Sequence, residues 1–137
     1  MIRATLCIVL SLIFVDGASA VASPNWELIH ATIIAEAAGE TYEAKVGIAE
    51  AIRNRGWSVS GFAGSRRKDL EQFVARQSEA VRRDASKALA AAQGGSQYVQ
   101  GSTIALGYPL DFNPPPRWLS KCKHTATFGN IKFYSEP

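Results

Sequence analysis

Glu36 is the carboxylic acid whose neighbours best suit it for acid catalysis. It lies near the end of an apolar segment, and Trp26, Ile29 and Ile33 precede it at the three- and four-residue steps that align side chains on one helical face. An apolar environment favours the neutral form of a carboxyl group, because desolvation penalises the charged form. Such a group can donate a proton to a departing oxygen near neutral pH. The alternative is a structural glutamate at a helix end, with its carboxylate in water.

Three other polar residues near Glu36 in the sequence invite a functional interpretation, and each has a structural alternative. Glu40 follows four residues later, so it is either a second active-site carboxylate or an acid near the start of the next helix, where the helix dipole favours it. Asn54 suits a hydrogen bond to an N-acetyl group, but an Asn at a helix end also serves as a local cap. We expect His30 to be structural.

Aromatic residues in the last part of the chain suit a sugar-binding groove. Trp118 and Tyr134 are candidates for substrate binding, because flat aromatic faces stack on sugar rings. Either side chain also suits a hydrophobic core. For the neighbouring Phe133 we expect the core, since Phe is among the residues most often buried.

The N-terminal segment has the features of a secretory signal peptide. Arg3 precedes an apolar run over residues 4–15, and Ala18-Ser19-Ala20 is a small-residue cleavage site. The apolar run is too short to span a membrane, so we expect no stable membrane insertion. Residues 1–20 are therefore predicted to be removed near Ala20, which leaves one domain, 21–137, in a secreted or periplasmic protein.

The charge and cysteine content narrow the possible partners. The 137-residue chain has a net charge of +3, with basic clusters at 66–68, Arg76 and 82–83. Together these clusters suit an anionic polymer outside the cytoplasm, whereas the lack of a basic arm or aromatic platform argues against nucleic acid. Cys122 is the only cysteine after the signal segment, and we expect a free buried thiol rather than a bond between chains. We expect no metal and no cofactor, because one Cys and one His do not make a metal site.

Periodicity and end signals predict four helices followed by a short β-containing region. Helix 26–37 should be buried on most sides and end at Gly39 in a left-handed conformation. Thr41 and Ser78 are predicted N-caps of the second and last helices, and we expect Glu50 and Arg53 to form an exposed pair on the second. The other expected elements are the following: helix 42–55, a short helix 68–74, a helix from 79 to Gly94-Gly95, a strand 103–106, and a hairpin of 125–128 and 131–134 around Gly129-Asn130.

Several blocks of the chain resemble the spore-cortex-lytic type of cell wall hydrolase. The blocks are residues 35–46, 48–55, 73–77, 116–118 and 128–134, and together they extend over nearly the whole of 21–137. This resemblance implies a mostly helical α+β fold, a lysozyme-like single domain with a small C-terminal β-hairpin. It places the catalytic acid on Glu36 and adds Gln77 to the candidates for substrate binding.

The resemblance also implies an activity, namely cleavage of the β-1,4 bond between N-acetylmuramic acid and N-acetylglucosamine in peptidoglycan glycan strands. Glycosidases with two carboxylates need a partner acid about 5–9 Å away. Helix-start roles account for Glu40 and Glu43, so a single-acid lytic transglycosylase is favoured. A muramidase with a second carboxylate stays open. So does an inactive glycan-binding relative, because Ile131 stands where the family often has His. We expect a monomer.

Overall fold

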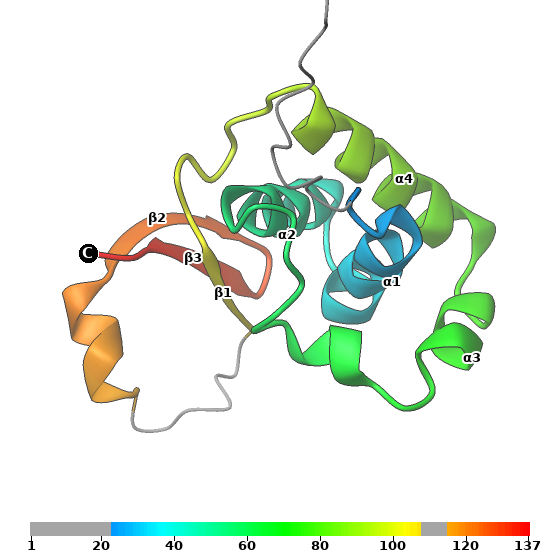
Figure 1. Ribbon diagram of the computed structural model, residues 1–137, viewed down its shortest axis with the longest axis horizontal. Coiled ribbons are helices and arrows are strands. Elements are labelled where there is room, and N and C mark those ends of the chain that lie inside the picture. The colour runs from blue at the N-terminus through cyan, green and yellow to red at the C-terminus, as the bar shows by residue number, and fades with distance from the viewer. Residues whose placement is uncertain (1–22, 108–114) are drawn as a thin grey trace, which may run out of the picture.

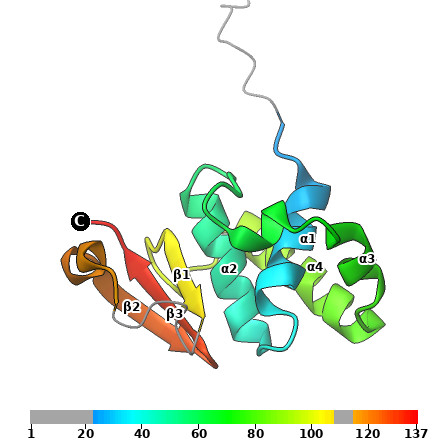
Figure 2. The ribbon, with the colours of Figure 1, turned by 90° about the horizontal axis from the view of Figure 1, so that it is seen from below.

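The computed structural model describes residues 23–107 and 115–137, and within these ranges a helical group packs against a small sheet. The elements in chain order are α1 (Trp26–Ala37), α2 (Tyr42–Asn54), the 3-10 helix η1 (Ala63–Arg66), α3 (Leu70–Ala75), α4 (Glu79–Gln93), β1 (Ile104–Gly107), the 3-10 helix η2 (Arg117–Lys121), β2 (Lys123–Phe128) and β3 (Ile131–Ser135). Figure 1 shows α1, α3 and α4 on one side of α2 and the sheet on the other. Figure 2, turned by 90°, shows the same order.

Helix α2 is the central element because both layers pack on it. Every residue from Ala44 to Ile52 is buried, so the helix has no exposed face over this stretch. Thr41 begins it as predicted, since its Oγ1 accepts a hydrogen bond from the Ala44 amide at 3.2 Å. An enclosed helix of this kind is stabilised by packing on all sides rather than by one apolar stripe.

Helix α1 has the predicted bounds, and its isoleucines are buried as predicted, but Trp26 at its start is 39% exposed. The Asn25 side chain caps it by accepting from the Leu28 amide at 3.0 Å, and Ile29, Ile33 and Ile34 are fully buried. The helix ends at Ala37, with Ala38 as a right-handed cap residue. The expectation of a left-handed Gly39 is wrong, because Gly39 is not among the residues with positive φ.

The remaining helices and strands follow the sequence pattern closely. Ser78 caps α4 by accepting from the Val81 amide at 3.2 Å, as predicted. The hairpin of β2 and β3 is present, and β1 pairs with β3 to extend it into a three-stranded antiparallel sheet in the order β1-β3-β2. The hairpin turns at Gly129, whose φ of 57° is a conformation that glycine adopts without strain.

A close contact between the sheet and α2 is formed by the Phe133 ring and by Gly47, which has no side chain. Phe133 on β3 is fully buried, as expected for a core residue. Its ring lies so close to Gly47, in the middle of α2, that a Cβ atom there would collide with it. The glycine therefore sets how near the sheet comes to the helix.

The prediction of an exposed Glu50–Arg53 pair is wrong. Glu50 is 0% exposed, and its carboxylate accepts hydrogen bonds from Ser96 Oγ at 2.6 Å and from the Tyr98 and Val99 amides at 3.0 Å each. These donors lie on the segment that joins α4 to β1. Glu50 thus holds the connection between helices and sheet in place, and its burial is tolerated because several donors satisfy the charge.

The predicted signal peptide, residues 1–20, lies outside the described residues. Within 23–107 and 115–137, no helix combines the length and the apolar character that a membrane span requires.

Candidate active site

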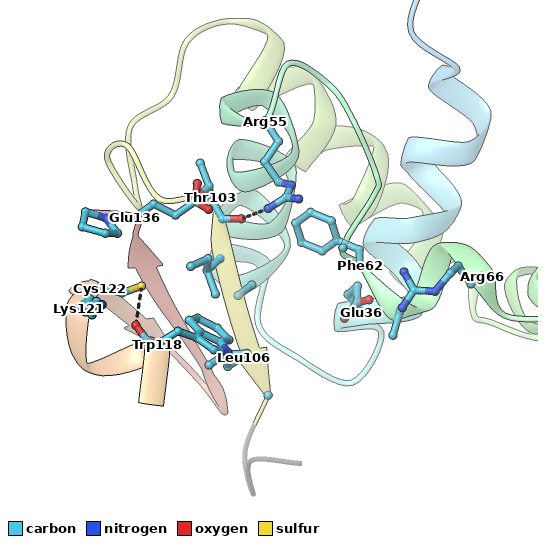
Figure 3. A pocket seen from close by; sticks show the side chains of 16 residues that line it. Glu36, Arg55, Phe62, Arg66, Thr103, Leu106, Trp118, Lys121, Cys122 and Glu136 are labelled. Carbon is cyan, nitrogen blue, oxygen red and sulfur yellow. Dashed lines mark hydrogen bonds between the residues drawn. The ribbon is translucent and has the colours of Figure 1, made fainter. Parts of the chain in front are cut away.

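A cleft of about 960 Å³ separates the helical part from the sheet and η2 (Figure 3). Its helical wall includes Glu36, Arg55, Phe62 and Arg66, which come from α1, the end of α2 and the segment around η1. The opposite wall consists of β1, η2 and the residues that follow β3: 103–107, Trp118, Lys121, Cys122, Glu136 and Pro137. The cleft therefore joins segments that are far apart in the sequence.

Glu36 reaches this cleft from the last turn of α1, and a backbone group holds it there. Its Oε1 accepts a hydrogen bond from the Gly64 amide at 2.7 Å. The side chain is half-buried and lines the cleft, so it is open to a ligand. Because Gly64 belongs to η1, the orientation of Glu36 depends on a segment 28 residues further along the chain.

Gly64 is suited to this contact because it has no side chain. A Cβ atom at this position would lie 2.7 Å from the Ala35 Cβ and 3.1 Å from Glu36 Oε1. Any larger residue would push η1 away from α1 and lengthen the bond to Glu36. The sequence analysis did not single out Gly64. Its position in a glycine- and serine-rich stretch indicates a turn but does not reveal which side chain the turn contacts.

Glu40 does not share the cleft with Glu36. Its Oε2 accepts from the Asn130 amide at 3.1 Å, in the turn between β2 and β3, and its backbone carbonyl accepts from Lys45 Nζ at 2.6 Å. Lys45 belongs to α2 and its side chain is buried, and this burial lowers its pKa. Glu40 does not line the cleft, and its carboxylate joins the hairpin turn to the α1–α2 connection, a contact that neither of the two expected roles included.

Another carboxylate does line the cleft. Glu136 follows β3, and its Oε2 accepts a hydrogen bond from Thr103 Oγ1 at 2.9 Å. In Figure 3 it lies on the sheet wall beside Thr103, whereas Glu36 lies on the helical wall. A mechanism with two carboxylates in this cleft would therefore involve Glu136 rather than Glu40.

Arg55 connects the two walls at one end of the cleft. Its Nη1 donates to the Thr103 carbonyl at 3.3 Å, and its guanidinium lies 5.9 Å from the centre of the Phe62 ring. Its Nε is buried and has no hydrogen-bond partner among the described residues. The side chain is thus engaged in joining the end of α2 to the start of β1, a role that sequence reasoning missed.

Trp118 is the predicted sugar-binding residue that the structure places in the cleft. It comes from η2, is 47% exposed, and lies on the wall opposite Glu36 (Figure 3). Cys122 lies beside it as a free, half-buried thiol that donates to the Trp118 carbonyl at 3.6 Å. An exposed indole facing a half-buried acid is an arrangement that fits a sugar chain lying between them.

The structure does not bring Asn54, Gln77 or Tyr134 to the cleft. The Asn54 amide donates to the carbonyls of Gln100 at 2.9 Å and Ser102 at 2.8 Å, so its donors are already used. Gln77 donates to the Phe73 carbonyl at 3.2 Å at the end of α3. Tyr134 packs edge-on against His124, with the ring centres 5.4 Å apart. These placements correct the predicted substrate contacts, because each side chain serves the local fold.

Within the part of the chain that the structure describes, His, Cys, Asp and Glu do not gather in groups of three or more that would hold a metal ion. The described side chains that line the cleft supply two carboxyl groups, an indole ring, a thiol and three cations.

The fold and the cleft together define a mostly helical, lysozyme-like α+β domain, as the sequence predicted. Two solved structures share this fold. The catalytic domain of the germination-specific lytic transglycosylase SleB from Bacillus anthracis matches with a TM-score of 0.60 and 15% identity, over 85% of this chain and 98% of that one. The catalytic domain of the Bacillus cereus SleB protein matches with a TM-score of 0.53 and 16% identity, over 83% and 94%. The sequence matches no family model and no curated protein.

Proposed function

We propose that this protein degrades peptidoglycan by cleaving the β-1,4 bond between N-acetylmuramic acid and N-acetylglucosamine, and that it acts as a lytic transglycosylase with Glu36 as its single general acid and base. The observation that carries this proposal is the placement of Glu36. A half-buried carboxyl group, held at 2.7 Å by the Gly64 amide, lines a long cleft in a fold shared with SleB catalytic domains.

The proposed reaction has two steps that need no water as nucleophile. Protonated Glu36 gives its proton to the glycosidic oxygen, the bond from this oxygen to the muramyl C1 breaks, and N-acetylglucosamine leaves with a free 4-hydroxyl group. The muramyl 6-hydroxyl oxygen then bonds to C1, and its proton passes to the Glu36 carboxylate. Glu36 is protonated again, and the muramyl end is a 1,6-anhydro sugar.

The experiment that tests this proposal is digestion of purified peptidoglycan, followed by mass spectrometry of the fragments. Anhydro ends, lighter by one water than hydrolysed ends, are the expected product. Glu36→Gln should fold normally and lose about 10²–10⁴-fold in rate, the usual share of general acid catalysis.

Two other outcomes have defined meanings. Reducing ends alone, together with a comparable loss of rate in Glu136→Gln, would replace the transglycosylase with a muramidase that uses both cleft carboxylates. Wild-type protein that binds the glycan but releases no fragments would identify an inactive glycan-binding relative.

We further propose that the protein acts outside the cytoplasm as a monomer, after removal of residues 1–20. This location follows from the features of the N-terminal segment and from the position of peptidoglycan itself. Mass spectrometry of the exported protein should find an N-terminus at Val21 or within a few residues of it. Exported protein that retains Met1 would contradict the proposed cleavage, and a dimer in light scattering would contradict the monomer.

A further inference from the structure

Most of the basic residues that the sequence analysis grouped into clusters are engaged within the protein. Arg67 and Arg76 both contact Asp69, at 2.5 Å and 3.3 Å. The hydrogen bond from Arg67 lowers the pKa of Asp69, and the Arg67 guanidinium also lies 3.8 Å from the centre of the Phe73 ring. These two arginines therefore belong to a local network and do not face the cleft.

The cluster on α4 is engaged in a similar way. Arg82 donates from Nη1 to the carbonyls of Ala75 at 3.2 Å and Gln77 at 2.7 Å, and Arg83 lies 3.4 Å from Glu79. The arginines of this cluster do not line the cleft. The positive charge on α4 thus supports the packing of the α3–α4 connection rather than binding of a substrate in the cleft.

Of the described residues, three cations line the cleft, and one of them, Arg55, is already bonded to the Thr103 carbonyl; the other two lie one on each wall. Arg66 lies at the end of η1, the same short helix that supplies the Gly64 amide to Glu36. Lys121 lies at the end of η2, close in sequence to Trp118. Neither forms an ion pair with any residue in the described ranges. In Figure 3 Arg66 lies beside Glu36, and Lys121 lies across the cleft.

We propose that Arg66 and Lys121 bind carboxylates on the muramyl residues of the glycan, so that the cleft selects acidic strands over neutral ones. This inference rests on the proposed glycan cleavage. Muramic acid differs from glucosamine by a lactyl ether on O3 that ends in a carboxyl group. In the cell wall this group is linked by an amide bond to a peptide with carboxylates of its own. Both sources present a carboxylate: the free lactyl group carries it beside the sugar ring, and the peptide carries it further out along the stem.

The expected strength of this recognition follows from the exposure of both cations. Arg66 and Lys121 are exposed, so water and salt weaken their attraction for a carboxylate. A charge-assisted hydrogen bond to one exposed cation changes kcat/KM by about threefold, so the two cations together give about tenfold, which is large enough to measure and smaller than the effect of removing the acid.

The test uses three forms of the same glycan. Intact peptidoglycan carries peptide stems, amidase-treated strands carry free lactyl carboxylates, and amidase-treated strands coupled to methylamine are neutral. Wild-type protein should cleave the free-carboxylate strands about tenfold faster than the neutral ones. Arg66→Gln and Lys121→Gln should each reduce this preference to about threefold, because each variant slows cleavage of the free-carboxylate strands more than cleavage of the neutral ones. The rate on intact peptidoglycan shows whether the peptide carboxylates are bound equally well.

Lys68→Gln is the matched control. Lys68 is an exposed cation two residues after Arg66 that does not line the cleft, so its removal changes the net charge equally and should leave the preference intact. Equal cleavage of charged and neutral strands by wild-type protein would overturn the inference but leave the proposed function standing. An equal loss on both strands in Arg66→Gln and Lys121→Gln would also overturn it. Failure to cleave any of the three forms would instead overturn the proposed function.

Discussion

The two walls of the cleft are built differently. The helical wall presents Glu36 from a helix whose Ile29 and Ile33 are fully buried, and a backbone amide fixes the carboxyl group. The sheet wall presents Trp118 and Lys121 from a short 3-10 helix with no buried residue. The difference indicates that the group for which position matters most is on the more tightly packed of the two elements, whereas contact surface for the substrate is on the more exposed one.

The contacts that join the two walls are largely side chain to backbone. Glu50 accepts from two amides of the α4–β1 segment, Glu40 accepts from the hairpin turn, and Arg55 donates to the carbonyl before β1. One apolar contact, Phe133 against Gly47, completes the junction. The following substitutions separate the contribution of each wall from that of the junction.

The largest expected effect on the junction is that of Glu50→Ala. It would leave one buried and two part-buried donors without their acceptor, so the free energy of unfolding should fall by about 3–5 kcal/mol. Urea denaturation measures this loss. Glu50→Gln is the control, because it keeps the volume and one acceptor oxygen, and it should lose less. A loss below about 1 kcal/mol in Glu50→Ala would show that the junction does not depend on this carboxylate.

Gly47→Ala tests the apolar part of the junction. The added methyl group would collide with the Phe133 ring, so the protein should lose about 1–3 kcal/mol of stability, although Ala is the better helix former. The double variant Gly47→Ala/Phe133→Leu should be more stable than the sum of the single losses indicates, because the smaller side chain makes room. Strictly additive losses would show that the Phe133 ring does not collide with a side chain at position 47.

Gly64→Ala tests the helical wall. Displacement of η1 should lengthen the bond to Glu36 and reduce kcat about 10- to 100-fold, while KM stays within about twofold. Steady-state kinetics on solubilised glycan separates the two constants. Gly39→Ala is the matched control, since a Cβ there meets nothing within 4 Å. Unchanged kcat in Gly64→Ala would show that Glu36 is positioned without this amide.

The smallest effect is expected for Glu40→Gln. The amide oxygen of Gln can still accept from the Asn130 amide, so stability should fall by no more than about 1 kcal/mol and activity should stay within about threefold of wild type. Thermal unfolding and a glycan-release assay measure the two quantities. A loss of activity close to that of Glu36→Gln would instead return Glu40 to the role of second carboxylate.

The helices, their caps and the hairpin could be predicted because their signals are local. Thr41 and Ser78 each cap a helix within three residues of their own position, and the hairpin turn is marked by its own Gly-Asn pair. Glu36 could be proposed as a catalytic group for the same reason, since its apolar neighbours lie on its own helix.

Two of the residues that the structure places differently, Asn54 and Glu50, share another property, because most of their partners are backbone groups. Asn54 was expected to bind an N-acetyl group or to cap its helix, and Glu50 to form an exposed pair with Arg53, but both bond to main-chain atoms of residues 98–102. Any residue type supplies a backbone amide or carbonyl, so the partner sequence carries no mark of the contact. Gly64 could not be predicted for a related reason. Its role is to let η1 approach α1 closely, which requires only that it has no side chain.

The complete enclosure of α2 has a consequence for how the molecule exchanges its amide hydrogens. The backbone from Ala44 to Ile52 has neighbours on every side, so its amides should exchange only when the whole protein unfolds. Strand β1 is an edge strand and only half-buried, so its amides should exchange through local opening. Deuterium uptake in the presence of a bound glycan fragment should therefore slow along β1 and η2, while α2 serves as an internal reference that does not respond.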